Sequence, residues 1–285
     1  MILTHFEPKG TRRPVDLNNT FAGQVAFLVG GAPSLKEQPV ELLNKRGVLT
    51  MAMNNSAVHF QSSLWVSGDR PECYEPQILF DPRIMKFAPL AHSQITVEGR
   101  KYWQMPNIYF YMFQDNVPWD EFLASRAVVP WYSNTLFVGI HILYQLGCRK
   151  IILAGSEFGF SSSGDMYAHK TNFGSLERKW NQDLYNSQVR ELRMLKPIFE
   201  NAGLTLMDAS KNSRLSQTYQ HLSLEDAVKL ALKEFPDKMK DPATLPHCSK
   251  FAPDDIQKKI ARWPGYQTII LPGAPPSVAE EVKIL

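Results

Sequence analysis

The chain has 285 residues, 44% of them hydrophobic, and its 31 lysines and arginines stand against 28 aspartates and glutamates. This length and apolar content can bury a full core, and a net charge of +3 gives no strong basic footprint for a nucleic-acid backbone. Three widely separated cysteines exclude a disulfide framework and a paired-cysteine zinc site.

The hydropathy pattern contains no apolar stretch long enough to span a membrane. The first ten residues also lack the continuous apolar core of a leader peptide. We therefore expect a cytoplasmic protein.

The first clear element is an apolar strand at residues 25–29, which runs straight into a turn of small residues. The turn consists of Gly30, Gly31, Ala32, Pro33 and Ser34. The glycines allow a ligand to approach the backbone, and Ser34 is placed to cap a helix predicted over residues 35–45, whose first amides would face a phosphate. The turn lacks the spaced glycines of a dinucleotide fingerprint and the lysine-hydroxyl ending of a Walker loop, and an ordinary strand-to-helix turn has a similar pattern.

Further apolar runs predict strands at residues 48–53, 63–66, 84–87, 107–112, 150–154 and 204–208. An apolar helix capped by Asn134 or Thr135 precedes the strand at 150–154, and a long amphipathic helix ends before Gly203. Strands that alternate with helices predict an α/β fold, with a Rossmann-like, mostly parallel sheet and helices on both faces.

Polar or small residues follow five of these strands directly, at residues 30–34, 54–56, 67–70, 155–157 and 208–213. Any one of these segments is also a plausible turn. Ligands of such sheets bind at the carboxyl ends of the strands, so the coincidence predicts one crevice.

The domain organisation is predicted to be a main α/β domain at residues 1–220 and a small extension at 221–285. The extension has one amphipathic helix at residues 223–232, and its remainder is rich in proline. We expect this segment to form a helical and irregular appendage.

Four side chains are candidates for chemistry at the crevice. Asp183 on the long helix and His169 in the polar loop 159–171 are candidate general bases, although a solvated aspartate and a surface histidine are equally simple interpretations. Tyr167 in the same loop is expected to donate a hydrogen bond to phosphate, and Glu157 at a strand end could reach a ribose hydroxyl. No His, Cys or Asp cluster has metal-ligand spacing.

Four blocks of residues resemble the glycosyltransferase family 42 sialyltransferases and the related MptE-like 6-hydroxymethylpterin diphosphokinases. The blocks are Gly30-Gly-Ala-Pro-Ser-Leu35, Met53-Asn-Asn-Ser56, residues 146–158 together with Tyr167, and Lys211-Asn-Ser213. The resemblance covers residues 24–213, and its most specific part is the pairing of the Pro-Ser-Leu turn with a late Gly-x-[Asp/Glu]-Phe strand end.

The resemblance implies that the first turn and Asn54 hold the nucleotide of an activated sugar. It also implies that Thr135, next to Asn134, matches the hydroxyl residue that opens the helix before the late strand, and that Tyr167 contacts the donor phosphate. The predicted donor-binding set is therefore Gly30, Gly31, Ala32, Pro33, Ser34, Asn54, Asn55, Ser67, Asp69, Asn134, Thr135, Gly155, Ser156, Glu157 and Phe158, beside the catalytic candidates Asp183, His169 and Tyr167.

This chain departs from the sialyltransferase pattern at three places. Gly159 and Phe160 stand where that family has a tyrosine, Tyr132 replaces an arginine, and the family's catalytic histidine falls near Asp183. The donor sugar is therefore left open.

The leading hypothesis is a glycosyltransferase that uses a nucleoside mono- or diphosphate sugar and a hydroxyl acceptor on a glycan, a protein or a hydroxylated base of modified DNA. For DNA, a locally basic groove would be needed, with Arg70, Lys170, Arg178, Lys179 and Arg190 as its candidates.

Two other functions remain open. One is MptE-like diphosphate transfer from ATP, although Asn54-Asn55-Ser56 stands where acidic metal ligands are expected and only Asp69 is near. The other is a non-catalytic nucleotide-binding protein. The sequence leaves a metal requirement undecided.

Overall fold

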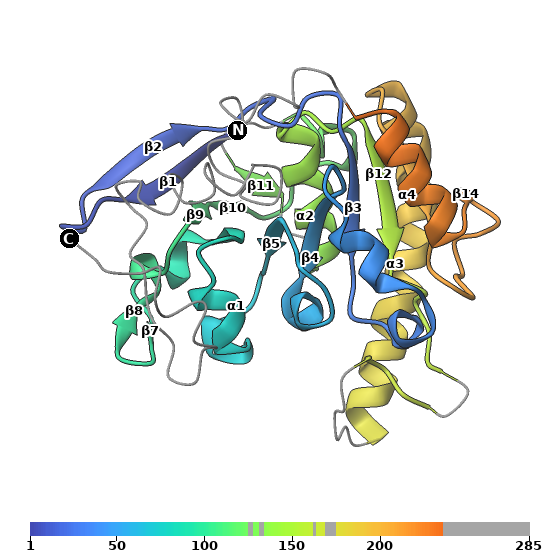
Figure 1. The fold of residues 1–285 in the computed structure, drawn as a ribbon, viewed down its shortest axis with the longest axis horizontal. Coiled ribbons are helices and arrows are strands. Elements are labelled where there is room, and N and C mark those ends of the chain that lie inside the picture. Colours follow the sequence, from blue (N-terminus) through green and yellow to red (C-terminus); the bar gives the residue numbers. More distant parts are fainter. Residues whose placement is uncertain (125–127, 131–133, 162–163, 169–174, 236–285) are drawn as a thin grey trace.

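A ten-stranded sheet organises the chain in a computed structural model, which describes residues 1–124, 128–130, 134–161, 164–168 and 175–235 (Figure 1). The strands of this sheet, in chain order, are β1 (Ile2–Phe6), β2 (Arg12–Asp16), β3 (Val25–Val29), β4 (Leu49–Met53), β5 (Leu64–Val66), β6 (Met85–Pro89), β9 (Ile108–Tyr111), β12 (Lys150–Ala154), β13 (Thr205–Asp208) and β14 (Gln220–His221). Two small pairs lie outside it, β7 (Thr96–Val97) with β8 (Arg100–Lys101) and β10 (Phe113–Gln114) with β11 (Val129–Pro130).

The helices are of two kinds. The α-helices are α1 (Pro76–Phe80), α2 (Thr135–Gln145), α3 (Ser175–Asn201) and α4 (Leu224–Lys233). The 3-10 helices are η1 (Pro33–Glu37), η2 (Val40–Asn44), η3 (Asn54–Val58), η4 (Pro71–Cys73), η5 (Leu90–His92), η6 (Tyr102–Gln104) and η7 (Trp119–Glu121).

The strand order confirms the predicted mostly parallel α/β sheet. It is β14-β13-β12-β3-β4-β5-β6-β9-β1-β2, and every pairing from β14 to β9 is parallel. From β3 the chain builds the sheet outward through β4, β5, β6 and β9, and later returns to place β12 on the other side of β3. The strand order thus reverses between β3 and β12, which is where sheets of this kind form their ligand crevice.

The hairpin of β1 and β2 was not predicted and closes one end of the sheet. β1 pairs antiparallel with β9 through Thr4 and Phe110, and β2 is the outermost strand. The two-residue strand β14 forms the opposite edge (Figure 1).

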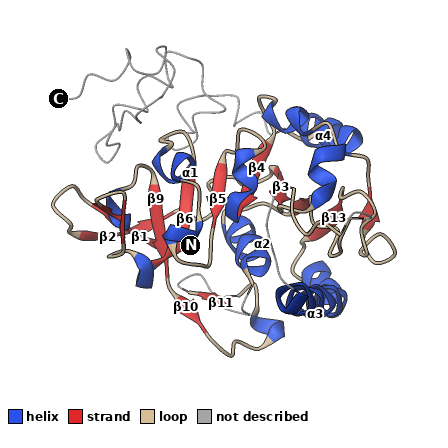
Figure 2. Ribbon diagram, turned by 90° about the horizontal axis from the view of Figure 1, so that it is seen from below, coloured by secondary structure: helices blue, strands red, loops and turns tan. Residues whose placement is uncertain are grey.

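Helices cover both faces of the sheet, as its apolar strands require. Along β3, Ala26 and Leu28 pack in the core with α2 and α3, whereas Phe27 and Val29 pack in the core with η1, α1 and α4. Figure 2 shows these two helical layers on opposite sides of the strands. A strand buried on both faces must be apolar throughout, which is why its sequence is a continuous apolar run.

The prediction of one helix over residues 35–45 is wrong. The structure has two 3-10 helices there, η1 and η2, separated by Gln38 and Pro39. Gln38 is extended with ψ at 152°, because the ring of a following proline disfavours the α conformation. The segment therefore presents no long helix to the crevice.

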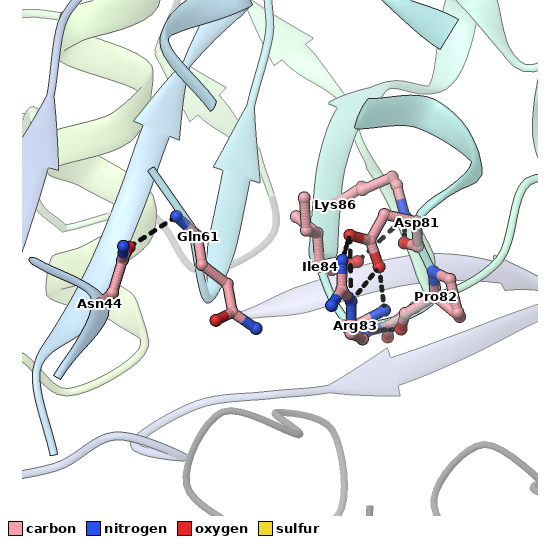
Figure 3. Close-up of polar contacts among 8 residues, drawn as sticks. Asn44, Gln61, Asp81, Pro82, Arg83, Ile84 and Lys86 are labelled. Atoms are coloured by element: carbon pink, nitrogen blue, oxygen red, sulfur yellow. Dashed lines mark hydrogen bonds and ion pairs between the residues drawn. The ribbon is translucent and has the colours of Figure 1, made fainter. Parts of the chain in front are cut away.

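Lys86 is a fully buried lysine at the start of β6, away from the carboxyl edge. Its Nζ donates to the main-chain oxygens of Asp81 and Ile84 at 2.5 and 3.0 Å (Figure 3). It also donates to the main-chain oxygen of Pro106 at 2.8 Å. Burial lowers the pKa of Lys86 to about 7, and the nearby Asp81 opposes this shift.

Figure 3 also shows Asn44, whose Oδ1 accepts from the Gln61 amide at 2.7 Å. Both contacts fix loops at strand ends and are structural.

The described part of the C-terminal segment belongs to the core. β14 pairs with β13, and Leu224, Ala227, Val228 and Ala231 of α4 pack in the same core as Phe27. Residues 236–285 lie outside the described residues, so the appendage stays a prediction. Within the described part of the chain, no helix is both long and apolar enough to cross a membrane.

Candidate functional site

The crevice predicted from the sequence would lie where the carboxyl ends of β3 and β12 meet. The Gly30 amide donates to the Ala154 oxygen at 2.8 Å, and the Ala32 amide donates to the Gly155 oxygen at 3.0 Å. A Cβ on Gly30 would lie 2.4 Å from the Gly155 oxygen, so only glycine permits this approach. Gly155 itself has a φ of +56°, which favours glycine as well. The two glycines therefore set the floor of the crevice.

Glu157 holds the two sides of this floor together. Its Oε1 accepts from the Ser34 amide at 2.8 Å and its Oε2 accepts from the Ser34 hydroxyl at 2.7 Å. Both residues are buried, and burial raises the pKa of the Glu157 carboxyl although the Ser34 hydrogen bonds oppose it. Glu157 therefore ties η1 to the end of β12, a contact that the sequence did not indicate.

This contact corrects the prediction of a phosphate cradle made of unpaired amides. Ala32, and not Ser34, is the N-cap of η1, and it makes no side-chain cap. The amide of Ser34 is bound to Glu157 and the amide of Leu35 donates to the Ala32 oxygen at 3.2 Å. The amides of Ser34 and Leu35 are thus satisfied within the protein, and the expected phosphate contact of this turn cannot use them.

The turn after Glu157 is strained and clamped. Phe158 has a φ of +59°, which is unusual for an aromatic residue. The Arg214 amide donates to the Glu157 oxygen at 3.3 Å, and Arg214 Nη1 donates to the Phe158 oxygen at 3.0 Å. Ser156 is held in the same way, because its amide donates to Ser210 Oγ at 2.9 Å. The Gly155 to Phe158 turn is thus a rigid wall.

Asn54 follows β4 directly and faces the same edge. Its φ of +53° is tolerated by asparagine, and its main-chain oxygen accepts from Trp65 Nε1 at 2.7 Å. Its Oδ1 accepts from the Tyr74 hydroxyl at 3.3 Å, which holds the side chain at this edge. Asn55 differs, because its Nδ2 donates to the Cys73 oxygen and its Oδ1 accepts from the Glu75 amide. Asn55 is therefore committed to holding its own loop.

The end of β5 contributes one buried and one exposed residue. Ser67 is fully buried, and its main-chain oxygen accepts from the Tyr111 hydroxyl at 2.5 Å. Asp69 is exposed, and its amide donates to the Tyr74 hydroxyl at 3.2 Å. Tyr74 thus joins Asp69 to Asn54 across two strand ends.

The N-terminus of α2 also reaches this edge. Its opposite end lies at the amino edge, because the Phe21 amide before β3 donates to the Leu146 oxygen at 2.7 Å. Asn134 caps the helix with Oδ1, which accepts from the Leu136 amide at 2.8 Å, while its buried Nδ2 has no hydrogen-bond partner among the described residues. Thr135 is buried beside it. The predicted cap is confirmed, and the helix end offers an unsatisfied donor.

Tyr167 lies over the floor of the crevice. Its Cδ1 would be 3.7 Å from a Cβ on Gly31, and the next amide, Ala168, donates to the Gly31 oxygen at 2.8 Å. The Tyr185 hydroxyl of α3 donates to the Tyr167 hydroxyl, and burial raises the pKa of both phenols. Tyr167 is therefore held in its protonated form at neutral pH.

Of the two predicted general bases, Asp183 is not brought to this cluster and His169 is not among the described residues. Asp183 is exposed and lies two residues from both Asn181 and Tyr185, hence on the opposite face of α3. His169 lies outside the described residues, as does Lys170 of the basic set.

The remaining basic candidates are exposed. Arg178, Lys179 and Arg190 lie on α3, and Arg70 pairs with Glu72 at 2.8 Å. The sequence analysis missed Tyr74 and Tyr185. Tyr185 could have been found, because it is a polar residue on the apolar face of α3. Among the described residues, no group of three His, Cys, Asp or Glu side chains could hold a metal ion.

Comparison with protein-family models and with curated proteins finds no match. Among solved structures, the chain is similar to the MAf glycosyltransferase from Magnetospirillum magneticum AMB-1, with a TM-score of 0.44 and 12% identity over 82% of this chain and 39% of that chain. It is also similar to the sialyltransferase CstII from Campylobacter jejuni in complex with cytidine-5'-monophosphate, with a TM-score of 0.39 and 13% identity over 70% of this chain and 84% of that chain. The chain thus spans about two fifths of the Magnetospirillum protein, and likeness this distant says nothing of what this chain binds.

Proposed function

We propose that the protein is a glycosyltransferase, which moves a sugar from a nucleoside mono- or diphosphate sugar to the hydroxyl of an acceptor. The observation that carries this proposal is a set of neutral hydrogen-bond donors around the carboxyl ends of β3, β4 and β12. These donors are the Asn54 amide, the buried Asn134 amide and the Tyr167 hydroxyl.

Such donors suit the departure of a nucleotide. In glycosyl transfer, the bond between the anomeric carbon and the phosphate oxygen breaks, and the phosphate keeps the electron pair. Hydrogen-bond donors that are fixed before the reaction stabilise the charge that develops there. Tyr167 is oriented by Tyr185, and Asn134 Nδ2 would gain the partner that it lacks among the described residues.

The rigid wall of residues 155–158 supports the same proposal. Ser34, Glu157 and Arg214 fix this wall from two sides, so the crevice keeps its shape without a ligand. A preformed crevice spends less binding free energy on ordering the protein. In this proposal the wall and the Gly30 to Ser34 turn contact the nucleoside part of the donor.

The acceptor remains a glycan, a protein or a hydroxylated base of modified DNA. Arg178, Lys179 and Arg190 along α3 are the exposed basic residues that would serve the last of these. A cytoplasmic location is part of the same proposal, since it places the enzyme with its nucleotide-sugar donor.

The test is a thermal-shift panel of CMP, UMP, UDP, GDP, ATP and the corresponding nucleotide sugars, with and without magnesium. A ligand at one hundred times its dissociation constant stabilises the folded protein by about 2.7 kcal/mol. We expect one nucleotide and its sugar to stabilise the wild type, and Tyr167→Phe to reduce that shift.

Tyr144→Phe is the matched control. Tyr144 lies at the far end of α2 and donates to the Ala202 oxygen at 3.1 Å, so its loss should lower the melting temperature without changing the nucleotide response. A response to ATP alone, and only with magnesium, would instead favour diphosphate transfer. Binding of a nucleotide sugar without turnover would favour a non-catalytic nucleotide-binding protein.

A further inference from the structure

Among the described residues, three carboxylates stand at the carboxyl ends of the parallel strands of the main sheet or within three residues after them. Two of them are buried and engaged: Glu157 with Ser34, and Asp208 with the Ser210 amide at 3.0 Å and His221 at 3.4 Å. The third is Asp69, after β5. It is exposed, and its carboxylate makes no hydrogen bond or ion pair with any described residue.

The backbone that carries Asp69 is fixed on several sides. The Ser67 amide donates to the Phe87 oxygen at 3.2 Å, and Tyr111 donates to the Ser67 oxygen at 2.5 Å. The Asp69 amide donates to the Tyr74 hydroxyl, which in turn donates to Asn54 Oδ1. The carboxylate is thus mounted on rigid backbone and joined through Tyr74 to a residue of the proposed donor site.

The charge of Asp69 acts on two tyrosines of this edge. Burial is the main cause of the raised pKa of Tyr74 and of Tyr167, and the charge of Asp69 raises both further. His92 of η5 contacts the Asp69 backbone from the side of β6. Asp69 is therefore near enough to Tyr167, which lies over Gly31, for its charge to be felt there.

We propose that Asp69 is the general base of the transfer reaction. This role rests on the proposed function. The acceptor O–H proton passes to Asp69 Oδ as the acceptor oxygen bonds to the anomeric carbon, and the bond from that carbon to the phosphate oxygen breaks with its electron pair on the nucleotide. A positioned carboxylate is suited to this proton transfer. Tyr167 donates to the departing phosphate.

This assignment differs from both candidates that the sequence suggested. Asp183 is exposed on the face of α3 opposite to Tyr185, so its carboxylate is turned from the crevice. His169 lies outside the described residues and becomes the competing outcome of the test.

The experiment compares Asp69→Asn with Glu72→Gln in the full chain. Glu72 is a neighbouring exposed carboxylate that pairs with Arg70 at 2.8 Å, so its variant controls for a local change of charge. Release of nucleotide from CMP-, UDP- and GDP-sugars is followed with water or glycerol as acceptor, and binding of CMP, UDP and GDP is followed by thermal shift.

We expect Asp69→Asn to lower turnover by about 10²- to 10⁴-fold. It should keep the wild-type nucleotide shift, because the nucleotide-binding residues are unchanged. Glu72→Gln should stay within about threefold of the wild type in both readouts, because an exposed ion pair contributes little.

Three results would overturn the assignment. Turnover of Asp69→Asn within threefold of the wild type, with a large loss in His169→Ala, would move the base to His169. Loss of a magnesium-dependent nucleotide shift in Asp69→Asn would make Asp69 a metal ligand. A wild type that neither binds these nucleotides nor turns over their sugars would refute the proposed function itself, and the base with it.

Discussion

Loss of the Glu157 carboxylate should strongly destabilise the fold. Glu157→Ala removes the acceptor of both the amide and the hydroxyl of Ser34, whose side chain is only 5% exposed. A buried donor left without a partner costs about 1–3 kcal/mol. The two donors together predict that the free energy of unfolding falls by about 2–6 kcal/mol.

Glu157→Gln separates the charge from the hydrogen bonds. The amide oxygen can accept from the Ser34 amide, and the amide nitrogen can donate to the Ser34 hydroxyl once that group rotates. Burial raises the pKa of Glu157 in the folded protein above its ordinary value of 4.5. The neutral carboxyl therefore favours folding below pH 4.5, and this stability is lost as the pH rises through the folded pKa.

The assay is urea unfolding followed by circular dichroism from pH 4 to pH 8. The wild type should lose stability relative to Glu157→Gln as the pH rises, and Glu37→Ala serves as control. Glu37 is about half exposed and pairs with Lys211 at 2.7 Å, so its removal should cost less than about 1 kcal/mol. The reasoning fails if Glu157→Ala costs under about 1 kcal/mol, or if the difference between wild type and Glu157→Gln is the same at every pH.

Two further predictions concern stability. Gly155→Ala should lower the free energy of unfolding by about 2–4 kcal/mol, because φ is +56° and the new Cβ would lie 2.6 Å from Leu35 Cγ and 2.8 Å from the Gly30 oxygen. Gly159→Ala is the control and should change the free energy of unfolding little, because its new Cβ would have no atom within 4 Å. Equal effects of the two variants in urea unfolding would contradict this reasoning. The pKa of Lys86 is about 7 in the folded protein against an ordinary 10.5. The free energy of unfolding of the wild type should therefore rise relative to that of Lys86→Met by up to about 1.4 kcal/mol per pH unit between pH 7.5 and 9.5. A difference in urea unfolding that does not change with pH would argue against the lowered pKa.

The central strands could be predicted from the sequence because burial on both faces leaves an apolar run. The strand predicted at residues 150–154 is confirmed with the same bounds in β12, and that at 204–208 differs from β13 by one residue. The edge hairpin was missed for the converse reason. β2 has the sequence Arg-Arg-Pro-Val-Asp and is mostly exposed, so no apolar pattern marks it.

The sequence predicted which residues lie at the site, but not which of them contact one another. The polar strand ends do gather at one edge, because parallel strands end together. The pairing of Glu157 with Ser34 joins residues 123 positions apart, and nothing local in either sequence indicates it. Pro39, in contrast, was a local signal that the helix expected over residues 35–45 would break.

The two ends of the sheet affect how the protein can associate with itself. An unpaired strand edge is a template for another chain, and long flat edges promote aggregation. Here β14 offers only two residues, while β2 carries exposed Arg12 and Arg13 and a proline at position 14 that lacks an amide hydrogen. Neither edge favours growth of the sheet into a neighbouring molecule. Among the described elements, the helical layers are therefore better suited than the sheet edges to contact a second copy of this protein.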